Sequence, residues 1–152
     1  MVIQIQDKDK KEQICRSILE ALPDWFGMPE GINEYTDSSR ELPLWADMDG
    51  EVVRGFVVLK ETSQYTAEVC VMGVRKEFHR LGIGKQLFRA LYEFARENGY
   101  EFLQVKTVQD GFYESYNKTN AFYKSMGFKE LECLETYWDK DNPCQIYVMS
   151  VK

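Results

Sequence analysis

The sequence predicts a mixed α/β fold in a single domain that spans residues 1–152. Three observations support this prediction. The chain has 152 residues, which suits one domain with one core, and 44% of them are hydrophobic, as in globular proteins. Runs with the two-residue period of strands alternate with runs that have the 3.6-residue period of helices. A glycine-rich turn joins an apolar strand pattern to a strongly amphipathic helix pattern.

The first forty residues are predicted to be rich in helix. Val2–Gln6 alternates weakly, which predicts a first strand. Asp7 or Asp9 can cap a helix that continues to about Leu22, where a proline follows. After a stretch broken by glycine and proline, we expect a short helix at Ile32–Glu41.

The remaining elements alternate between strands and helices. A hairpin is expected from Pro43–Asp47 and Val52–Lys60, joined by a turn that contains Gly50. The apolar run Thr66–Val74 predicts a buried strand, and a helix follows it to Asn98. The same signals predict a helix at Phe112–Met126 and strands at Tyr100–Val108, Phe128–Thr136 and Gln145–Val151.

The turn before that long helix has the features of an anion site. Gly82 and Gly84 turn the chain, and no Ser, Thr, Asp or Asn stands at the cap position, so the first N–H groups need other partners. An anion suits them, because these N–H groups and the helix dipole both favour negative charge. An ordinary glycine-rich turn is the alternative. The nearby basic residues are Arg75, Lys76, Arg80 and Lys85, against one acid, Glu77.

The stretch His79–Gly84 reads His-Arg-Leu-Gly-Ile-Gly. It resembles the central motif of the GNAT superfamily of N-acetyltransferases, Gln/Arg-x-x-Gly-x-Gly/Ala, with His79 as the departure. The resemblance implies acetyl-CoA as co-substrate, with its pyrophosphate on the backbone amides of this turn. It covers Val52–Phe128 well and the N-terminal forty residues only by element order. The cofactor-binding residues that it implies are Met72, Val74, His79, Arg80, Leu81, Gly82, Gly84, Lys85 and Tyr116.

A second motif supports the resemblance. The segment Asn120–Phe128 ends in Tyr-x-x-x-Gly-Phe, as in the family, where this tyrosine points at the sulfur of CoA. By this resemblance Tyr123 is the candidate general acid, and a core tyrosine is the alternative. Seven residues earlier many members have asparagine, whereas this chain has Tyr116.

The strand Thr66–Val74 supplies the candidate base. Members that use a carboxylate base have a glutamate at the place of Glu68, and the alternative is a solvent-exposed glutamate. Strand alternation predicts Glu68, Cys70 and Met72 on one face. Gly73 suggests a bulge that frees amides for the pantetheine arm, unless it only accommodates core packing. His79, the only histidine, is expected to have a structural or phosphate-contact role.

The resemblance also implies an architecture and a reaction. The sheet is expected to be twisted, mainly antiparallel and covered by helices on both faces, and to splay between its fourth and fifth strands, Thr66–Val74 and Tyr100–Val108. Acetyl-CoA would lie in that opening, and an amine would attack the thioester directly in a ternary complex.

Two other functions remain open. One is a non-catalytic acyl-CoA-binding or regulatory module of the same fold, against which the pair Glu68 and Tyr123 argues. The other is an unrelated nucleotide-binding domain. The P-loop pattern Gly-x-x-x-x-Gly-Lys-Ser/Thr is absent, and Leu87 stands where the dinucleotide fingerprint needs a third glycine.

The amine acceptor is the least determined part. We expect a small-molecule or peptide amine. Aromatic and acidic residues in the first two helices and nearby loops fit a cationic amine, and they fit core and solvated surface equally well. These residues are Trp25, Phe26, Tyr35 and Trp45 with Glu30, Glu34 and Asp37.

Composition excludes several classes of function. The net charge of −6 argues against a general nucleic-acid binder, and no run approaches the length of a membrane span. Four scattered cysteines without a Cys-x-x-Cys pattern, and one histidine, argue against a metal site. We expect a cytoplasmic protein with reduced thiols, either a monomer or a homodimer.

Overall fold

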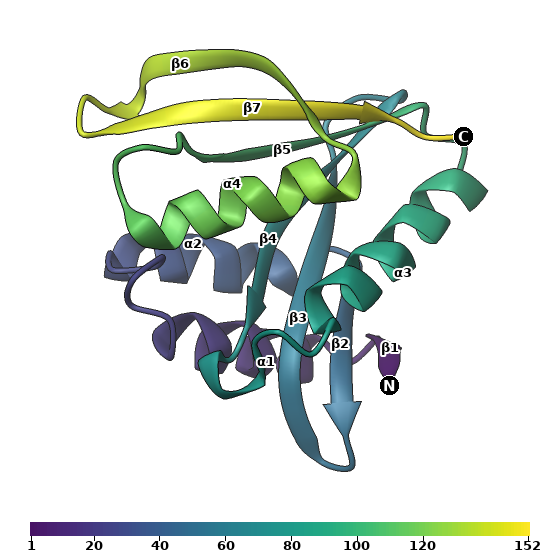
Figure 1. Ribbon diagram of the computed structural model, residues 1–152. Coiled ribbons are helices and arrows are strands. Elements are labelled where there is room, and N and C mark those ends of the chain that lie inside the picture. The colour runs from purple at the N-terminus through teal and green to yellow at the C-terminus, as the bar shows by residue number, and fades with distance from the viewer.

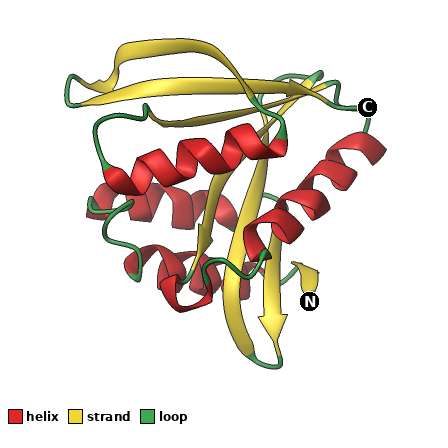
Figure 2. Ribbon diagram, in the orientation of Figure 1, coloured by secondary structure: helices red, strands yellow, loops and turns green.

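The computed structural model describes residues 1–152. Four helices and a seven-stranded sheet form a mixed α/β fold, as predicted (Figures 1 and 2). The strand order is β1-β2-β3-β4-β5-β7-β6, and every neighbouring pair is antiparallel except β4 and β5. The helices are α1 (Lys8–Glu20), α2 (Pro29–Ser39), α3 (Ile83–Glu97) and α4 (Glu114–Met126). The strands are β1 (Val2–Ile5), β2 (Leu44–Asp49), β3 (Val52–Glu61), β4 (Thr66–Val74), β5 (Phe102–Val108), β6 (Lys129–Asp139) and β7 (Asn142–Ser150).

The boundaries differ from the predictions mainly where prolines and turns were misjudged. Helix α2 begins at Pro29 rather than Ile32, because proline fits the first helical position. The last hairpin is longer than predicted, since the Asp139 carboxylate accepts bonds from the Asp141 backbone N–H and the Asn142 amide, at 2.9 Å each. None of the helices has the length and apolarity needed to cross a bilayer.

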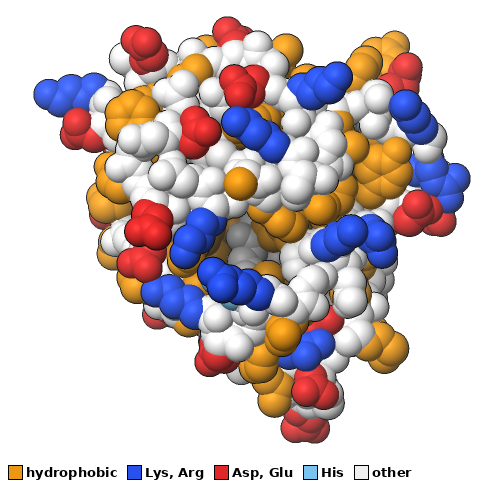
Figure 3. Space-filling view, viewed as in Figure 1, with side chains coloured by type: hydrophobic (Ala, Val, Ile, Leu, Met, Phe, Trp, Pro, Cys, Tyr) orange, Lys and Arg blue, Asp and Glu red, His pale blue; other side chains and the backbone are white.

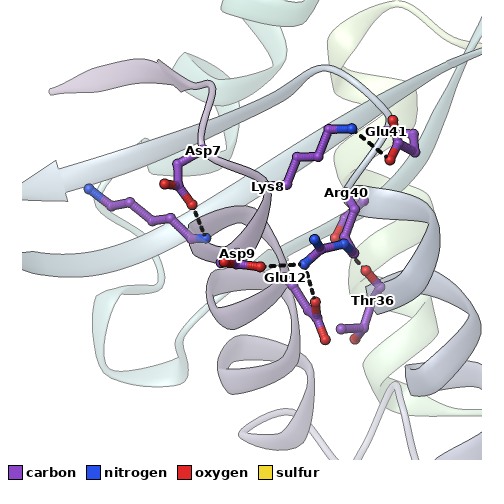
Figure 4. Close-up of polar contacts among 9 residues, drawn as sticks. Asp7, Lys8, Asp9, Glu12, Thr36, Arg40 and Glu41 are labelled. Atoms are coloured by element: carbon purple, nitrogen blue, oxygen red, sulfur yellow. Dashed lines mark hydrogen bonds and ion pairs between the residues drawn. The ribbon is translucent and has the colours of Figure 1, made fainter.

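Helices α1 and α2 cover one face of the sheet. Ile14, Ile18 and Leu19 of α1 are buried in a core cluster that includes Phe56 and Val71 of the sheet. At the surface, ion pairs join the N-terminal part of α1 to the residues that follow α2 (Figure 4). The pairs are Arg40 with Asp9 at 2.7 Å and Glu12 at 2.6 Å, and Lys8 with Glu41 at 2.9 Å.

Helices α3 and α4 cover the opposite face, and they lie in front of the sheet in Figure 1. The α3 residues Ile83, Leu87 and Leu91 are buried there, as their spacing predicts. Phe128, which follows α4, packs against Phe88 of α3 with ring centroids 5.5 Å apart. The two helices thus share one core over the middle of the sheet.

The sheet splays between β4 and β5, as the family resemblance implied. These two parallel strands pair over only four positions, from Thr66 opposite Phe102 to Val69 opposite Val105. Beyond them, β4 stays paired with β3 as far as Val74, and β5 stays paired with β7. Each side of the opening is therefore held by its outer neighbour, which keeps the gap open.

A bulge lies in β4 just where the two strands part. Val58 pairs with Val71 and Leu59 with Val69, so Cys70 is the extra residue. The prediction that Met72 shares a face with Glu68 and Cys70 was wrong. The bulge reverses the alternation, so Met72 packs on the α3 side and Cys70 on the α1 side.

Gly73 is not the bulge residue, contrary to expectation. It pairs in register with Phe56. A Cβ atom there would lie 3.1 Å from both Ile18 Cγ2 and Leu22 Cδ1. Close packing of α1 on β4 therefore leaves no room for a side chain at position 73, which explains the glycine.

Candidate active site

A cavity of about 830 Å³ occupies the opening between β4 and β5. It is lined from both faces of the sheet, by Phe122 and Tyr123 of α4 and by Phe26, Ile32 and Tyr35 from the region of α2. The cavity therefore passes through the sheet. Figure 3 shows a hollow in the middle of the α3–α4 face with Lys and Arg side chains around it.

The turn before α3 forms one wall of the cavity and presents free backbone donors. Gly82 caps the helix with φ 77°, and Arg80 also has a left-handed φ, of 66°. No side chain caps the helix, and the first helical bond runs from the Gln86 N–H to the Gly82 carbonyl. The amides of residues 83–85 are thus free for a ligand. Nothing lies within 4 Å of a Cβ placed on Gly82, so an anion can approach the backbone there.

Gly84 lines the cavity, and its lack of a side chain also has a packing role. A Cβ atom at this position would lie 3.2 Å from Cε1 of the Phe122 ring. The missing side chain therefore makes room for α4 to pack against the start of α3, while the role of Gly84 in binding the cofactor stays a prediction. This contact sets the distance between two walls of the cavity.

His79 lines the cavity and is held by contacts to β4 and to Trp25, while a contact with phosphate stays a prediction. Its Nε2 lies 2.7 Å from the Val74 carbonyl oxygen, and its ring contacts Trp25 edge to face at 6.0 Å between centroids. The side chain thus ties the turn back to the end of β4.

Tyr123 lies in the cavity wall with its ring in the core. The ring packs against Phe128 and Tyr147, with centroids 5.7 and 6.5 Å away. The hydroxyl has no protein partner, yet no fully buried side-chain oxygen lacks one, so this hydroxyl must be accessible from the cavity. Burial, with smaller contributions from Tyr35 and Tyr116, raises the pKa of Tyr123 well above its ordinary value, and the phenol stays protonated.

Glu68 is nearly buried and doubly hydrogen-bonded. Its Oε1 accepts bonds from Gln104 Nε2 and Lys106 Nζ, both at 2.8 Å. Glu68 does not itself line the cavity, whereas Lys106 does. Burial alone would lower the pKa of Lys106, but the hydrogen bond and charge of Glu68 outweigh burial and raise it. Lys106 is therefore a cation at neutral pH and stands between the carboxylate and the cavity.

Trp25 and α4 form a clasp that sequence reasoning did not find. The Trp25 indole N–H donates to Thr119 Oγ1 at 2.9 Å, and the Trp25 carbonyl accepts from the Tyr116 hydroxyl at 2.6 Å. Burial raises the pKa of Tyr116 to about 12, which keeps its hydroxyl a donor. This Trp25 clasp, made by Trp25, Tyr116 and Thr119, fixes the α1–α2 loop to α4 beside the cavity.

Other expected residues divide between the cavity, the core and the surface. Trp45 is buried against Phe94 in the core, away from the cavity. The three α2 acids, Glu30, Glu34 and Asp37, are exposed and do not line it.

Lys118 and Phe122 line the cavity and were missed. They lie four residues apart on α4, and this spacing on one helix face was the available signal.

Comparisons with known proteins agree with this geometry. The family described as "Acetyltransferase (GNAT) domain" matches residues 40–130. The chain is 28% identical over 102 residues to the uncharacterized N-acetyltransferase YsnE of Bacillus subtilis, covering 67% of this chain. It is 30% identical over 112 residues to the N-alpha-acetyltransferase RimI of Mycobacterium tuberculosis, covering 72% of this chain. Each match spans 66% of the relative's own length.

Solved structures share the fold at low identity. A putative GNAT-family acetyltransferase from Desulfovibrio desulfuricans superposes with a TM-score of 0.87 at 16% identity, covering 100% of both chains. An IAA acetyltransferase from Bacillus cereus superposes with a TM-score of 0.77 at 23% identity, covering 99% of this chain and 98% of that one.

Proposed function

The chain belongs to the GNAT family of acetyltransferases, and from this premise we propose that it transfers an acetyl group from acetyl-CoA to a primary amine. The observation that carries the proposal is the Tyr123 hydroxyl, which has no protein partner and is accessible from a cavity between the splayed strands.

The residues around the cavity suit the co-substrate. The free amides at the start of α3 and the open space at Gly82 fit the pyrophosphate. Arg80, Lys85 and Lys118 line the same cavity and add positive charge. The β4 segment Met72–Val74 lines the opening, which suits it to contact the pantetheine arm.

Direct attack by the amine fits the cavity better than a covalent enzyme intermediate. Cys70 is the only cysteine that lines the cavity, and burial raises the pKa of its thiol to about 11. A protonated thiol is a poor nucleophile. The amine nitrogen therefore bonds to the acetyl carbon as the carbon–sulfur bond breaks, with both substrates bound.

Tyr123 then acts on the departing sulfur. The thiolate gains negative charge as the carbon–sulfur bond breaks, and the protonated phenol donates a hydrogen bond to it. A free thiol has a pKa near ~8.5, below that of this phenol, so full proton transfer is uphill in water. Burial also disfavours the thiolate and so raises the pKa of the thiol. The difference between the pKa values of the thiol and the phenol becomes smaller, which lets the phenol supply the proton.

Glu68 is the base for the attacking amine. Gln104 and Lys106 hold Oε1, which leaves Oε2 for another partner. Because Glu68 does not line the cavity, a water molecule carries the proton from the amine to the carboxylate. The Glu68–Lys106 ion pair also favours a second candidate function, a non-catalytic acyl-CoA-binding module in which the carboxylate is only structural.

One experiment separates these functions. The protein is mixed with acetyl-CoA and a panel of primary amines, and free thiol and acetylated amine are both measured. The proposal predicts amine-dependent thiol release in equal amounts with acetylated product. CoA binding in calorimetry without thiol release from any amine supports the binding module instead.

A further inference from the structure

The cavity has two chemically different ends. Its opening on the α3–α4 face carries Arg80, Lys85 and Lys118, which suit phosphates. Its other end lies on the α1–α2 face and under the tip of the β6–β7 hairpin. If the co-substrate enters at the basic end, the amine enters at the second one.

The two charged side chains that line this second end already have partners. Lys106 is bound to Glu68 at 2.8 Å. Asp139 accepts hydrogen bonds on both carboxylate oxygens from Asn142, at 2.9 and 3.1 Å, within its own hairpin turn. No other Asp or Glu lines the cavity. An acceptor with several positive charges therefore finds a single carboxylate, Asp139, which is exposed to solvent and already accepts hydrogen bonds on both oxygens.

Apart from Asn142, which bonds to Asp139, the side chains at this end are mainly apolar and aromatic. Phe26, Met28, Ile32, Tyr35 and Trp138 line it. Aromatic faces stabilise a single ammonium group, and apolar walls stabilise a hydrocarbon body. A second ammonium group would lose its hydration with only the exposed, already hydrogen-bonded Asp139 carboxylate as a partner, which is costly.

We propose that the acceptor is a small monoamine with an aromatic or other apolar body, whose only charge is the amine that is acetylated. The inference rests on the proposed acetyl transfer and adds the substrate class. Trp138 is the residue that selects the apolar body. It lies at the tip of the β6–β7 hairpin, which brings its ring to the cavity from an element outside the β4–β5 opening.

The test compares four acceptors under the same conditions. 2-Phenylethylamine represents the proposed class, spermidine and kanamycin represent polycations, and a tripeptide beginning with Met represents peptide N-termini. We expect kcat/KM for 2-phenylethylamine to exceed that for each of the others at least ~10-fold. An equal or higher value for spermidine, kanamycin or the tripeptide overturns the inference.

Variants locate the selectivity. Trp138→Ala should raise KM for 2-phenylethylamine several-fold and leave KM for acetyl-CoA unchanged, and Trp138→Phe should restore much of the loss. Phe102→Ala is the matched control, because Phe102 is exposed to a similar extent, 44% against 42% for Trp138, but does not line the cavity. An equal effect of Phe102→Ala, or no effect of Trp138→Ala, contradicts the assignment.

A binding measurement separates failure of this inference from failure of the proposed function. Calorimetry of 2-phenylethylamine and of spermidine with the CoA-saturated protein needs no turnover. Tighter binding of 2-phenylethylamine supports the acceptor class even if no amine releases thiol, in which case only the acetyl transfer fails. If amines are acetylated but spermidine binds more tightly than 2-phenylethylamine, the inferred acceptor class is contradicted and the proposed acetyl transfer is supported.

Discussion

Lys106 Nζ lies 2.8 Å from Glu68 Oε1, on the oxygen that also accepts from Gln104 Nε2. The lysine and the glutamine come from β5, and the glutamate comes from β4 at a paired position. The ion pair therefore joins the two strands where their pairing ends and they part. It also fixes the orientation of the carboxylate.

Lys106→Met should destabilise the protein by about 1–2 kcal/mol, between the values of exposed and buried ion pairs. Because the folded pKa of Lys106 is raised above its ordinary value of 10.5, this stabilisation is fully present below pH 10.5 and is lost as pH rises through the raised pKa. Urea unfolding at pH 7 measures the effect. Lys8→Met, which breaks an exposed pair with Glu41 at 2.9 Å, should lower the free energy of unfolding much less. Equal losses in the two variants would refute the structural importance of the Glu68–Lys106 pair.

Glu68→Gln should slow acetyl transfer mainly at low pH. A base is needed only while the amine is protonated, so the deficit should shrink as the pH approaches the pKa of the amine. General bases typically contribute ~10²–10⁴-fold. Steady-state rates across pH check this, and a variant with full activity at neutral pH would exclude Glu68 as the base.

Two substitutions at Gly84 separate packing from charge. Gly84→Ala introduces only a Cβ, 3.2 Å from the Phe122 ring, and should lower the melting temperature with a modest loss of CoA affinity. Gly84→Asp adds a negative charge beside the free amides and should weaken CoA binding at least ~10-fold, about 1.4 kcal/mol. Calorimetry with CoA decides, and similar affinities for both variants would argue against a phosphate at this turn.

Trp25→Phe tests the Trp25 clasp. It keeps an aromatic ring but removes the indole N–H that donates to Thr119 Oγ1 at 2.9 Å. The expected cost is about 1 kcal/mol, together with faster amide exchange in the α1–α2 loop and a higher KM for the amine. Unchanged exchange in that loop would show that the hydrogen bond does not hold it.

The sequence predicted the parts of the fold that local patterns determine. It did not predict the features that depend on contacts between distant residues. The stripe of Ile83, Leu87 and Leu91 identified α3 correctly because helical periodicity is a local property. The bulge at Cys70 could not be recognised in the sequence, because β4 is covered by apolar residues on both faces and its residues show no change of pattern there. The pairing of Glu68 with Lys106 spans 38 positions and depends on the parallel register of two strands.

Aromatic residues were equally ambiguous in the sequence. Trp25 and Trp45 appeared equivalent as acceptor contacts, yet Trp45 is 6% exposed in the core while Trp25 bonds to α4 beside the cavity. Only the packing of distant elements separates the two. Tyr123 was identified by its motif, and its hydroxyl is accessible from the cavity, while its role in the reaction stays a prediction.

The most direct measurement is a single-turnover rate of acetyl transfer for Tyr123→Phe, with the melting temperature of the same preparation. If the hydroxyl supplies the proton to the departing thiolate, the rate should fall ~10²-fold or more, with the acetyl-CoA dissociation constant and the melting temperature nearly unchanged. Tyr147→Phe is the matched control. It removes a buried hydroxyl that donates to Asn120 Oδ1 at 2.6 Å, so it should lower the melting temperature and leave the rate near normal. A near-normal rate in Tyr123→Phe with a lowered melting temperature would contradict the account.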